Sequence, residues 1–240
     1  LKHQKTPELY ESKSPKIKSF LKNVHPECLF ITSCGFVSGI SLRILEEMRK
    51  KSKIQLMYII PDKNNLNKTK RLQNNLLFNV FQEYARSAVF EKIILVDNKK
   101  ISDIIGSVSV LKYWDTINKL ICTTYNMINV FEHLEPVFST FSGKSEASRI
   151  FTIGTASLES DEENCFFSLD LLKEKWYYYA IPQSMLEEDE TLMKKMQTQV
   201  KNAIKDDTMK VGYSIYSTNY DQTYVYCTYN TTLIQKLPAS

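Results

Sequence analysis

Residues 28–49 read CLFITSCGFVSGISLRILEEMR, an apolar run that leads through a glycine-containing turn into a helical pattern. The first five residues are compact and apolar, which is typical of a buried strand. Further on, Leu42, Leu45 and Met48 recur near helical spacing, and acidic residues precede basic ones, which suits the helix dipole. The stretch therefore predicts a strand, a loop over residues 33–39 and a helix.

The same alternation continues along the chain. Residues 54–60 and 93–96 are two further apolar runs, and residues 66–87 between them follow a helical pattern. Alternating strands and helices favour a parallel sheet covered by helices, in which ligands bind beyond the carboxyl ends of the strands. Three strand ends are therefore the places where we expect a site: residues 33–39, 61–65 and 97–98.

A long helical pattern without Gly or Pro runs from residue 108 to residue 130. Its apolar members are Leu111, Trp114, Ile117, Leu120, Ile121, Tyr125 and Ile128. Because they cover much of the circumference, we expect this helix to be buried on most sides. Residues 132–141 are expected to add a short further turn of helix.

The pattern changes after this helix. Residues 150–153 and 176–181 predict strands, and residues 185–204 predict one amphipathic helix. Residues 211–216 and 224–229 alternate polar and apolar side chains, as a half-exposed antiparallel pair would. The predicted fold class is α/β, with a parallel sheet flanked by helices, a long central helix and a smaller α+β domain. The corresponding boundaries are 1–107, 108–131 and 132–240.

Composition excludes several classes of protein. With 43% hydrophobic and 24% charged residues, the 240-residue chain is ordinary for a globular protein. Five scattered cysteines without a CxxC pair argue against a zinc site or a disulfide framework and favour buried reduced thiols. The net charge of +4 is weak, so the basic clusters at residues 49–51 and 68–71 are interpreted as solvated helix faces rather than a nucleic-acid surface.

The start of the chain carries no apolar signal core, and no run is long enough to span a bilayer. We therefore expect a cytoplasmic protein without a membrane partner. Since residue 1 is Leu rather than Met, we also expect a piece upstream, and a processed start is the alternative.

The order of these elements resembles that of the tubulin/FtsZ/TubZ superfamily over roughly residues 28–230. The loop at residues 33–39 stands where that family has GGGTG(S/T)G, and Gly35, Ser38 and Gly39 match it. The resemblance implies that these residues approach nucleotide phosphates at a helix N-terminus. Cys34 and Val37 depart from the pattern, and their side chains would hinder that approach.

Two asparagines carry the resemblance further. The strand end Asp97-Asn98 resembles the Asp-Asn pair of tubulin, whose Asn binds the guanine edge, so the resemblance implies that role for Asn98. Residues 113–121 resemble the start of tubulin's central helix, with one extra residue, and imply Asn118 as the second base-reading group. The alternative interpretations are an Asx turn at Asn98 and an ordinary mid-helix polar residue at Asn118.

Beyond the central helix, the family has an acidic loop that reaches the next subunit and positions the water that attacks GTP. Glu132 and Glu135 keep the acid-to-acid spacing of that loop, although both lie one residue late. Two acids three residues apart share one face of a helical turn, where they could act on a metal–water–phosphate site with Mg²⁺. An ordinary solvated pair at the start of a helix is the alternative.

Two functions follow from this resemblance. The first is a GTP-binding cytoskeletal protein that self-associates into filaments and hydrolyses GTP at subunit contacts. The second is a nucleotide-free structural subunit of a larger assembly, motivated by the altered glycine loop and the shifted acids. The Asn-, Lys- and Ile-rich composition suits an AT-rich genome, such as that of a phage or a low-GC bacterium. A small-molecule enzyme is a third, weaker alternative, because no catalytic pair stands at the strand ends.

Overall fold

The computed structural model describes residues 17–35, 40–141 and 147–237, together with Leu9, Ser12, Gly143 and Ser145. The chain forms two compact units. Unit 1 comprises Leu1–Asn98 and Ile234–Ser240, and unit 2 comprises Lys99–Leu233. The domain boundaries inferred from the sequence stay predictions.

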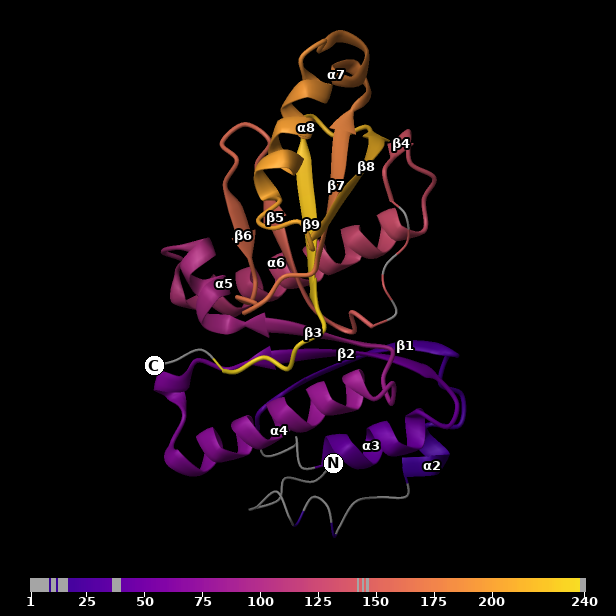
Figure 1. Cartoon of the computed structure of the whole chain (residues 1–240). Coiled ribbons are helices and arrows are strands. Elements are labelled where there is room, and N and C mark those ends of the chain that lie inside the picture. The colour runs from indigo at the N-terminus through magenta and orange to yellow at the C-terminus, as the bar shows by residue number, and fades with distance from the viewer. Residues whose placement is uncertain are drawn as a thin grey trace. The chain divides into compact units, whose positions relative to one another are not determined.

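Unit 1 is built on a parallel sheet of β1 (Glu27–Ser33), β2 (Lys53–Ile60) and β3 (Lys92–Asp97). Helix α3 (Ser41–Met48) connects β1 to β2, and α4 (Lys68–Arg86) connects β2 to β3. Both helices lie against the same face of this sheet (Figure 1). The described part of the unit also contains the short helices α2 (Ile17–Phe20) and η2 (Lys63–Asn65). The parallel sheet flanked by helices that the alternation predicts is confirmed.

Helix α4 packs on β2 through aromatic side chains. The buried Tyr58 ring contacts Phe78 and Phe81, and its hydroxyl donates to Asn74 Oδ1 at 2.7 Å. This buried face does not include Leu72 and Leu76, which are 71% and 63% exposed. The helical pattern of residues 66–87 predicts one apolar side that includes Leu72 and Leu76, but tertiary packing buries the neighbouring face of the helix.

Unit 2 contains a mixed sheet. Its strands lie in the order β6 (Glu163–Cys165), β5 (Ile150–Ala156), β9 (Tyr224–Thr231), β7 (Glu174–Pro182), β8 (Lys210–Thr218) and β4 (Phe138–Ser139). Only β7 and β8 run parallel among these pairs. The strands at 211–216 and 224–229 are therefore not neighbours, because β7 lies between them. They are also buried along most of their length, so the predicted half-exposed pair is wrong.

All nine residues of β7 are buried, because helices cover both faces of the sheet. On one face, Tyr177 and Tyr179 pack in a core that includes Leu192 and Met196 of α8 (Leu192–Ala203). On the other, Phe131 of α6 (Tyr113–Glu132) stacks on Tyr216 with ring centroids 4.5 Å apart. The run of tyrosines at residues 177–179 predicts a strand with one buried and one exposed face, and this expectation is wrong, because both faces are covered.

The long central helix of the sequence pattern is α6, preceded by η3 (Val110–Lys112) and α5 (Asn98–Ile105). Its buried residues form one stripe: Ile117, Ile121, Thr124, Ile128 and Phe131. Leu111 and Trp114 are 93% and 61% exposed, so burial on most sides is wrong.

Two further segments differ from the sequence expectation. Residues 132–141 do not form a helical turn, because α6 ends at Glu132 and the chain enters β4 after Pro136, a residue that disfavours helix before it. The helix expected at 185–204 is two helices, α7 (Gln183–Glu188) and α8. They are separated at Asp189, whose carboxylate accepts hydrogen bonds from both the backbone N–H and the hydroxyl of Thr191.

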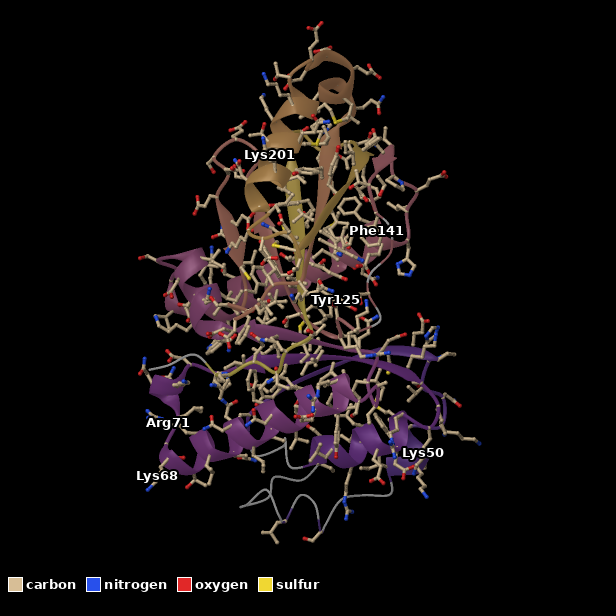
Figure 2. The ribbon with its side chains drawn as sticks, in the orientation of Figure 1. Lys50, Lys68, Arg71, Tyr125, Phe141 and Lys201 are labelled. Carbon is tan, nitrogen blue, oxygen red and sulfur yellow. The ribbon has the colours of Figure 1, made fainter. Side chains whose placement is uncertain are left out.

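The basic clusters lie at helix ends of unit 1. Figure 2 shows Lys68 and Arg71 close together and Lys50 well apart from them. The Lys50 ammonium pairs with Glu47 at 2.9 Å, and Arg71 Nε donates to the carbonyl oxygen of Leu66. Among residues with described positions, no helix combines the length and apolarity needed to cross a membrane.

The five cysteines are free, but their burial differs. Cys227 is buried, whereas Cys122 is exposed and Cys28, Cys34 and Cys165 are half-buried. The expectation of buried thiols therefore holds for Cys227 and is wrong for Cys122, which lies on the outer side of α6.

Candidate functional site

The loop after β1 is the first candidate segment. An added Cβ at Gly35 would meet no atom within 4 Å, so space is open at this residue. Nearby, Cys34 Sγ donates to the carbonyl oxygen of Lys70 at 3.4 Å, and burial raises the pKa of the Cys34 thiol. Ser38 and Gly39, the other predicted phosphate-binding residues, lie outside the described residues, as do Phe36 and Val37.

Asn98 is the second candidate, at the carboxyl end of β3 where α5 begins. Its Oδ1 atom is buried and accepts no hydrogen bond from any residue that the structure describes. An Asx turn would require this oxygen to accept a nearby backbone N–H, so that interpretation is not supported. A buried acceptor without a donor costs about 1–3 kcal/mol, which a ligand N–H group would offset.

Guanine presents N–H donors, and the Asn98 side-chain oxygen is an acceptor. The Asn98 side chain therefore has the chemistry needed to bind the guanine base that the resemblance implies. Asn118 lies on the exposed side of α6, next to the buried Ile117. Asn98 belongs to unit 1 and Asn118 to unit 2, and their convergence on one base stays a prediction.

The acidic pair is arranged differently from the sequence expectation. Glu132 is the last residue of α6, and Glu135 lies beyond the helix end, so the two carboxylates do not share one helical face. Glu132 Oε1 accepts the Tyr178 hydroxyl at 2.9 Å, which connects the end of α6 to β7. Burial, and next the charge of Glu132, raise the pKa of Tyr178 well above its ordinary value. The helical geometry proposed for a shared metal–water site is therefore wrong.

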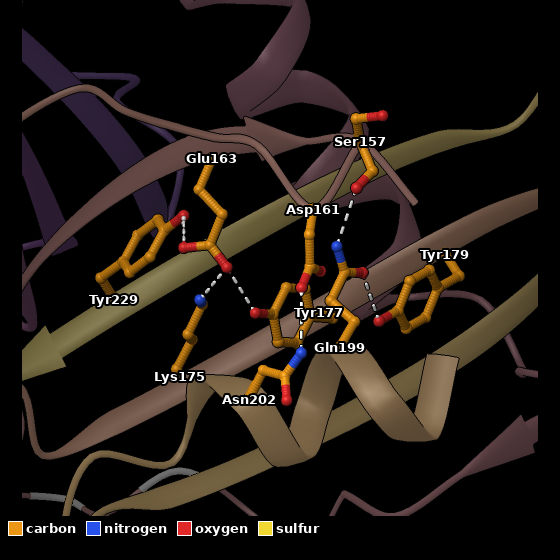
Figure 3. Close-up of polar contacts among 9 residues, drawn as sticks. All are labelled: Ser157, Asp161, Glu163, Lys175, Tyr177, Tyr179, Gln199, Asn202 and Tyr229. Atoms are coloured by element: carbon orange, nitrogen blue, oxygen red, sulfur yellow. Dashed lines mark hydrogen bonds and ion pairs between the residues drawn. The ribbon is translucent and has the colours of Figure 1, made fainter. Parts of the chain in front are cut away.

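A separate polar cluster, which the sequence analysis missed, lies within unit 2 (Figure 3). Lys175 of β7 has a side chain only 4% exposed, and its ammonium pairs with Glu163 of β6. Tyr177 and Tyr229 both donate their hydroxyls to the same carboxylate, at 2.5 and 3.3 Å. The ammonium also lies over both phenol rings, 4.5 and 5.1 Å from the centroids.

This cluster forms part of the wall of a cavity of about 410 Å³ between the β6 segment and α8. Two α8 side chains bind the segment that leads into β6: Gln199 Nε2 donates to the carbonyl oxygen of Ser157, and Asn202 Nδ2 donates to Asp161. Gln199 Oε1 also accepts the Tyr179 hydroxyl at 2.8 Å. Lys175 and Glu163 neutralise each other's charge, so neither side chain is available as a free acid, base or nucleophile. Their ion pair instead attaches β6 to β7.

The sequence did carry a signal for this cluster. Glu174 and Lys175 directly precede the apolar run that becomes the rest of β7, and a charged residue inside a buried strand requires a partner. No local pattern identifies that partner as Glu163, twelve residues earlier in the acidic segment. Throughout the described part of the chain, no three His, Cys, Asp or Glu side chains gather as a metal site would need.

The fold is similar to solved structures of two kinds of protein. A helical model of the TubZ-Bt four-stranded filament matches with a TM-score of 0.71 and 15% identity, over 96% of this chain and 72% of that chain. A GTPγS-form protofilament of Bacillus thuringiensis serovar israelensis TubZ gives 0.66 and 13%, over 95% and 71%. An FtsZ dimer from M. jannaschii gives 0.63 and 10%, over 94% and 70%.

No family model and no curated protein matches the chain. At 10–15% identity, the likeness to these structures concerns the arrangement of helices and strands. It covers 94–96% of this chain and so spans both units. The chain therefore has the tubulin/FtsZ/TubZ-like fold.

Proposed function

We propose that this chain binds GTP at the carboxyl ends of β1 and β3 and self-assembles into filaments, with hydrolysis of GTP at subunit contacts. The single observation that carries the nucleotide proposal is the buried Asn98 Oδ1 atom, which lacks a donor among the described residues. In this proposal Asn98 reads the guanine edge, Asn118 is the second base-reading group, and the loop from Gly35 through Ser38 and Gly39 approaches the phosphates.

The open space at Gly35 supports this proposal, because a phosphate can approach the backbone where no Cβ and no neighbouring atom intervenes. Mg²⁺ would accompany the triphosphate and neutralise part of its charge. The filament part is supported by relatives in fold whose solved structures are filaments and protofilaments.

Equilibrium binding of labelled GTP to the purified protein tests the nucleotide proposal. Replacing Asn98 with Ala should weaken GTP binding about tenfold or more, which corresponds to about 1.4 kcal/mol for the lost amide contacts. The matched control is Asn126→Ala, an exposed asparagine on α6, which should leave binding unchanged. ATP should compete poorly, since its base does not present the guanine donors. Absence of GTP binding at millimolar nucleotide would refute the proposal.

A second candidate is a tubulin-like structural subunit that assembles without nucleotide chemistry. The observation that favours it is the acidic pair: Glu132 is engaged by Tyr178, and Glu135 lies off the helix. This candidate predicts equal assembly before and after bound nucleotide is removed with phosphatase, and no phosphate release. Assembly that depends on GTP, accompanied by phosphate release that Glu135→Gln abolishes, would favour the first function.

A further inference from the structure

The β6–α8 cavity, the space of about 410 Å³ between the β6 segment and α8, has the size of a small-molecule site. Such sites measure about 300–1,000 Å³ and combine apolar walls with a few polar groups. Leu169, Leu172 and Ala203 supply the apolar wall here, and the lining also includes Lys175. The described lining residues all belong to unit 2 and include none of those proposed to contact GTP. A ligand in this cavity would therefore occupy a second, separate site.

The Lys175 ammonium, which lines this cavity, retains hydrogen-bond donors that Glu163 does not use (Figure 3). An ammonium has three N–H groups, and within the described part of the chain Glu163 Oε1 is the acceptor for one of them. The rings of Tyr177 and Tyr229 attract the positive charge through their π-electrons, but they offer the ammonium no lone pair. Because the Lys175 side chain is only 4% exposed, water has little access to the remaining N–H groups. Buried donors of this kind need acceptors, which a ligand in the cavity can supply.

The acidic side of the cavity has little acceptor capacity left for a ligand. Glu163 already accepts the Lys175 ammonium and two tyrosine hydroxyls, which occupy three of about four acceptor positions on a carboxylate. Burial raises the pKa of Cys165 to about 11, so this thiol adds no negative charge to the wall. The unused hydrogen-bonding capacity is therefore that of a cationic donor, and it fits a ligand that brings an anionic acceptor.

The rim of the cavity carries a second cation. Lys205, which follows the end of α8, lines the cavity and is exposed. Asp161 also lines the cavity and is exposed, and its carboxylate accepts Asn202 Nδ2 at 3.1 Å. The Lys205 charge attracts an entering anion, whereas the Asp161 charge opposes it.

We propose that the β6–α8 cavity binds a small organic carboxylate. The carboxylate accepts hydrogen bonds from Lys175, the charge of Lys205 favours its entry, and its hydrocarbon body packs on the apolar wall. A single negative charge fits this site, because the nearby Glu163 carboxylate would repel a dianion more strongly. The inference concerns unit 2 alone and does not depend on the proposed binding of GTP.

Calorimetric titration with three probes of equal hydrocarbon length tests the inference. The probes are octanoate, 1-octanol and octylamine, which differ in the charge of the head group. Octanoate should bind saturably at millimolar concentration, and 1-octanol should bind about tenfold more weakly or less, because it lacks the charged acceptor. Octylamine should not bind, since its ammonium would face Lys175. Saturating octanoate should also raise the melting temperature, because it binds the folded protein.

Variants at the rim change the charge without touching the buried ion pair. Lys205→Gln should weaken octanoate binding about threefold, because the attracting charge is lost. Asp161→Asn should strengthen binding by a similar factor, and asparagine tolerates the left-handed backbone of this residue, whose φ is 59°. The matched control is Lys201→Gln, at an exposed α8 lysine that is not among the lining residues and should leave binding unchanged (Figure 2).

Lys175→Met removes the buried donor and should abolish the preference for octanoate over 1-octanol. Thermal melting shows whether this variant is folded. If it is not, the two rim variants still decide the question, because both altered side chains are exposed. Equal affinity for octanoate and 1-octanol in the unmodified protein would overturn the proposal, as would absence of octanoate binding at millimolar concentration. Identical octanoate affinities for Lys205→Gln, Asp161→Asn and Lys201→Gln would overturn it too, since octanoate would then be bound elsewhere.

Discussion

The hydroxyl of Tyr178 lies 2.9 Å from Oε1 of Glu132, so the last residue of α6 is hydrogen-bonded to β7, an interior strand of the unit 2 sheet. The phenol is buried and the acceptor carries a charge, which makes this contact stronger than a neutral hydrogen bond. It fixes where α6 ends relative to β7. The same contact occupies one oxygen of the carboxylate for which the family resemblance implies a catalytic role.

Replacing Tyr178 with Phe should lower the free energy of unfolding by about 1–2 kcal/mol, because one charge-assisted hydrogen bond is lost. Glu132→Gln should cost less, since an amide oxygen still accepts the hydroxyl. Urea titration measures both changes. Tyr84→Phe, at a tyrosine that is 39% exposed, serves as the control and should be neutral. Equal stability of Tyr178→Phe and the unmodified protein would show that the bond contributes nothing.

Gly212→Ala should destabilise the protein, because the added Cβ would lie 2.1 Å from Cζ3 of the buried Trp176. Overpacking of this kind costs about 1–3 kcal/mol. Gly35→Ala should leave stability unchanged, since its Cβ meets no atom within 4 Å. If phosphates approach Gly35, this second variant should nevertheless weaken GTP binding. Thermal melting and nucleotide binding on the same two variants distinguish a packing role from a ligand role.

Glu163→Gln should cost about 3–5 kcal/mol, because it leaves the Lys175 ammonium buried without a counter-charge. Lys175→Met should cost less, since Glu163 is 29% exposed and keeps the two tyrosine donors. The control is Glu83→Gln in the exposed pair with Arg86, where a change below about 1 kcal/mol is expected. A larger cost for Lys175→Met than for Glu163→Gln in urea titrations would contradict this account.

Asp189 should make stability depend on pH at the start of α8. Its hydrogen bonds with Thr191, and then its ion pair with Lys195, lower its pKa from 3.8 to about 2. A lowered pKa means that the stabilisation is complete above 3.8 and is lost as the pH falls through about 2. Asp189→Asn should therefore lower the melting temperature at neutral pH.

The difference between Asp189→Asn and the unmodified protein should disappear as the pH approaches about 2. Glu190→Gln, at the neighbouring exposed acid, is the control and should not alter melting. A melting difference for Asp189→Asn that is constant over this pH range would contradict the role of the ionised carboxylate.

Several elements were predictable because their signals are local. The apolar runs that became β1, β2 and β3 each end at a polar or turn-forming residue, and the helical patterns between them require parallel strands. The position of Asn98 at a strand end followed from the same reasoning. The sequence pattern did not predict that the helix would break at Asp189, because the apolar periodicity continues across this residue. The break is caused by the Asp189 carboxylate, which accepts hydrogen bonds from Thr191 just before α8 begins.

The sequence by itself determined the order of strands and helices, since periodicity and turn residues act over a few neighbouring positions. Tertiary structure alone decided that β7 lies between β8 and β9, that both of its faces are covered, and that Glu132 meets Tyr178. These outcomes depend on contacts between residues far apart in the chain. The free energy gained by burying a whole sheet face is larger than the preference that the local pattern of any one strand expresses.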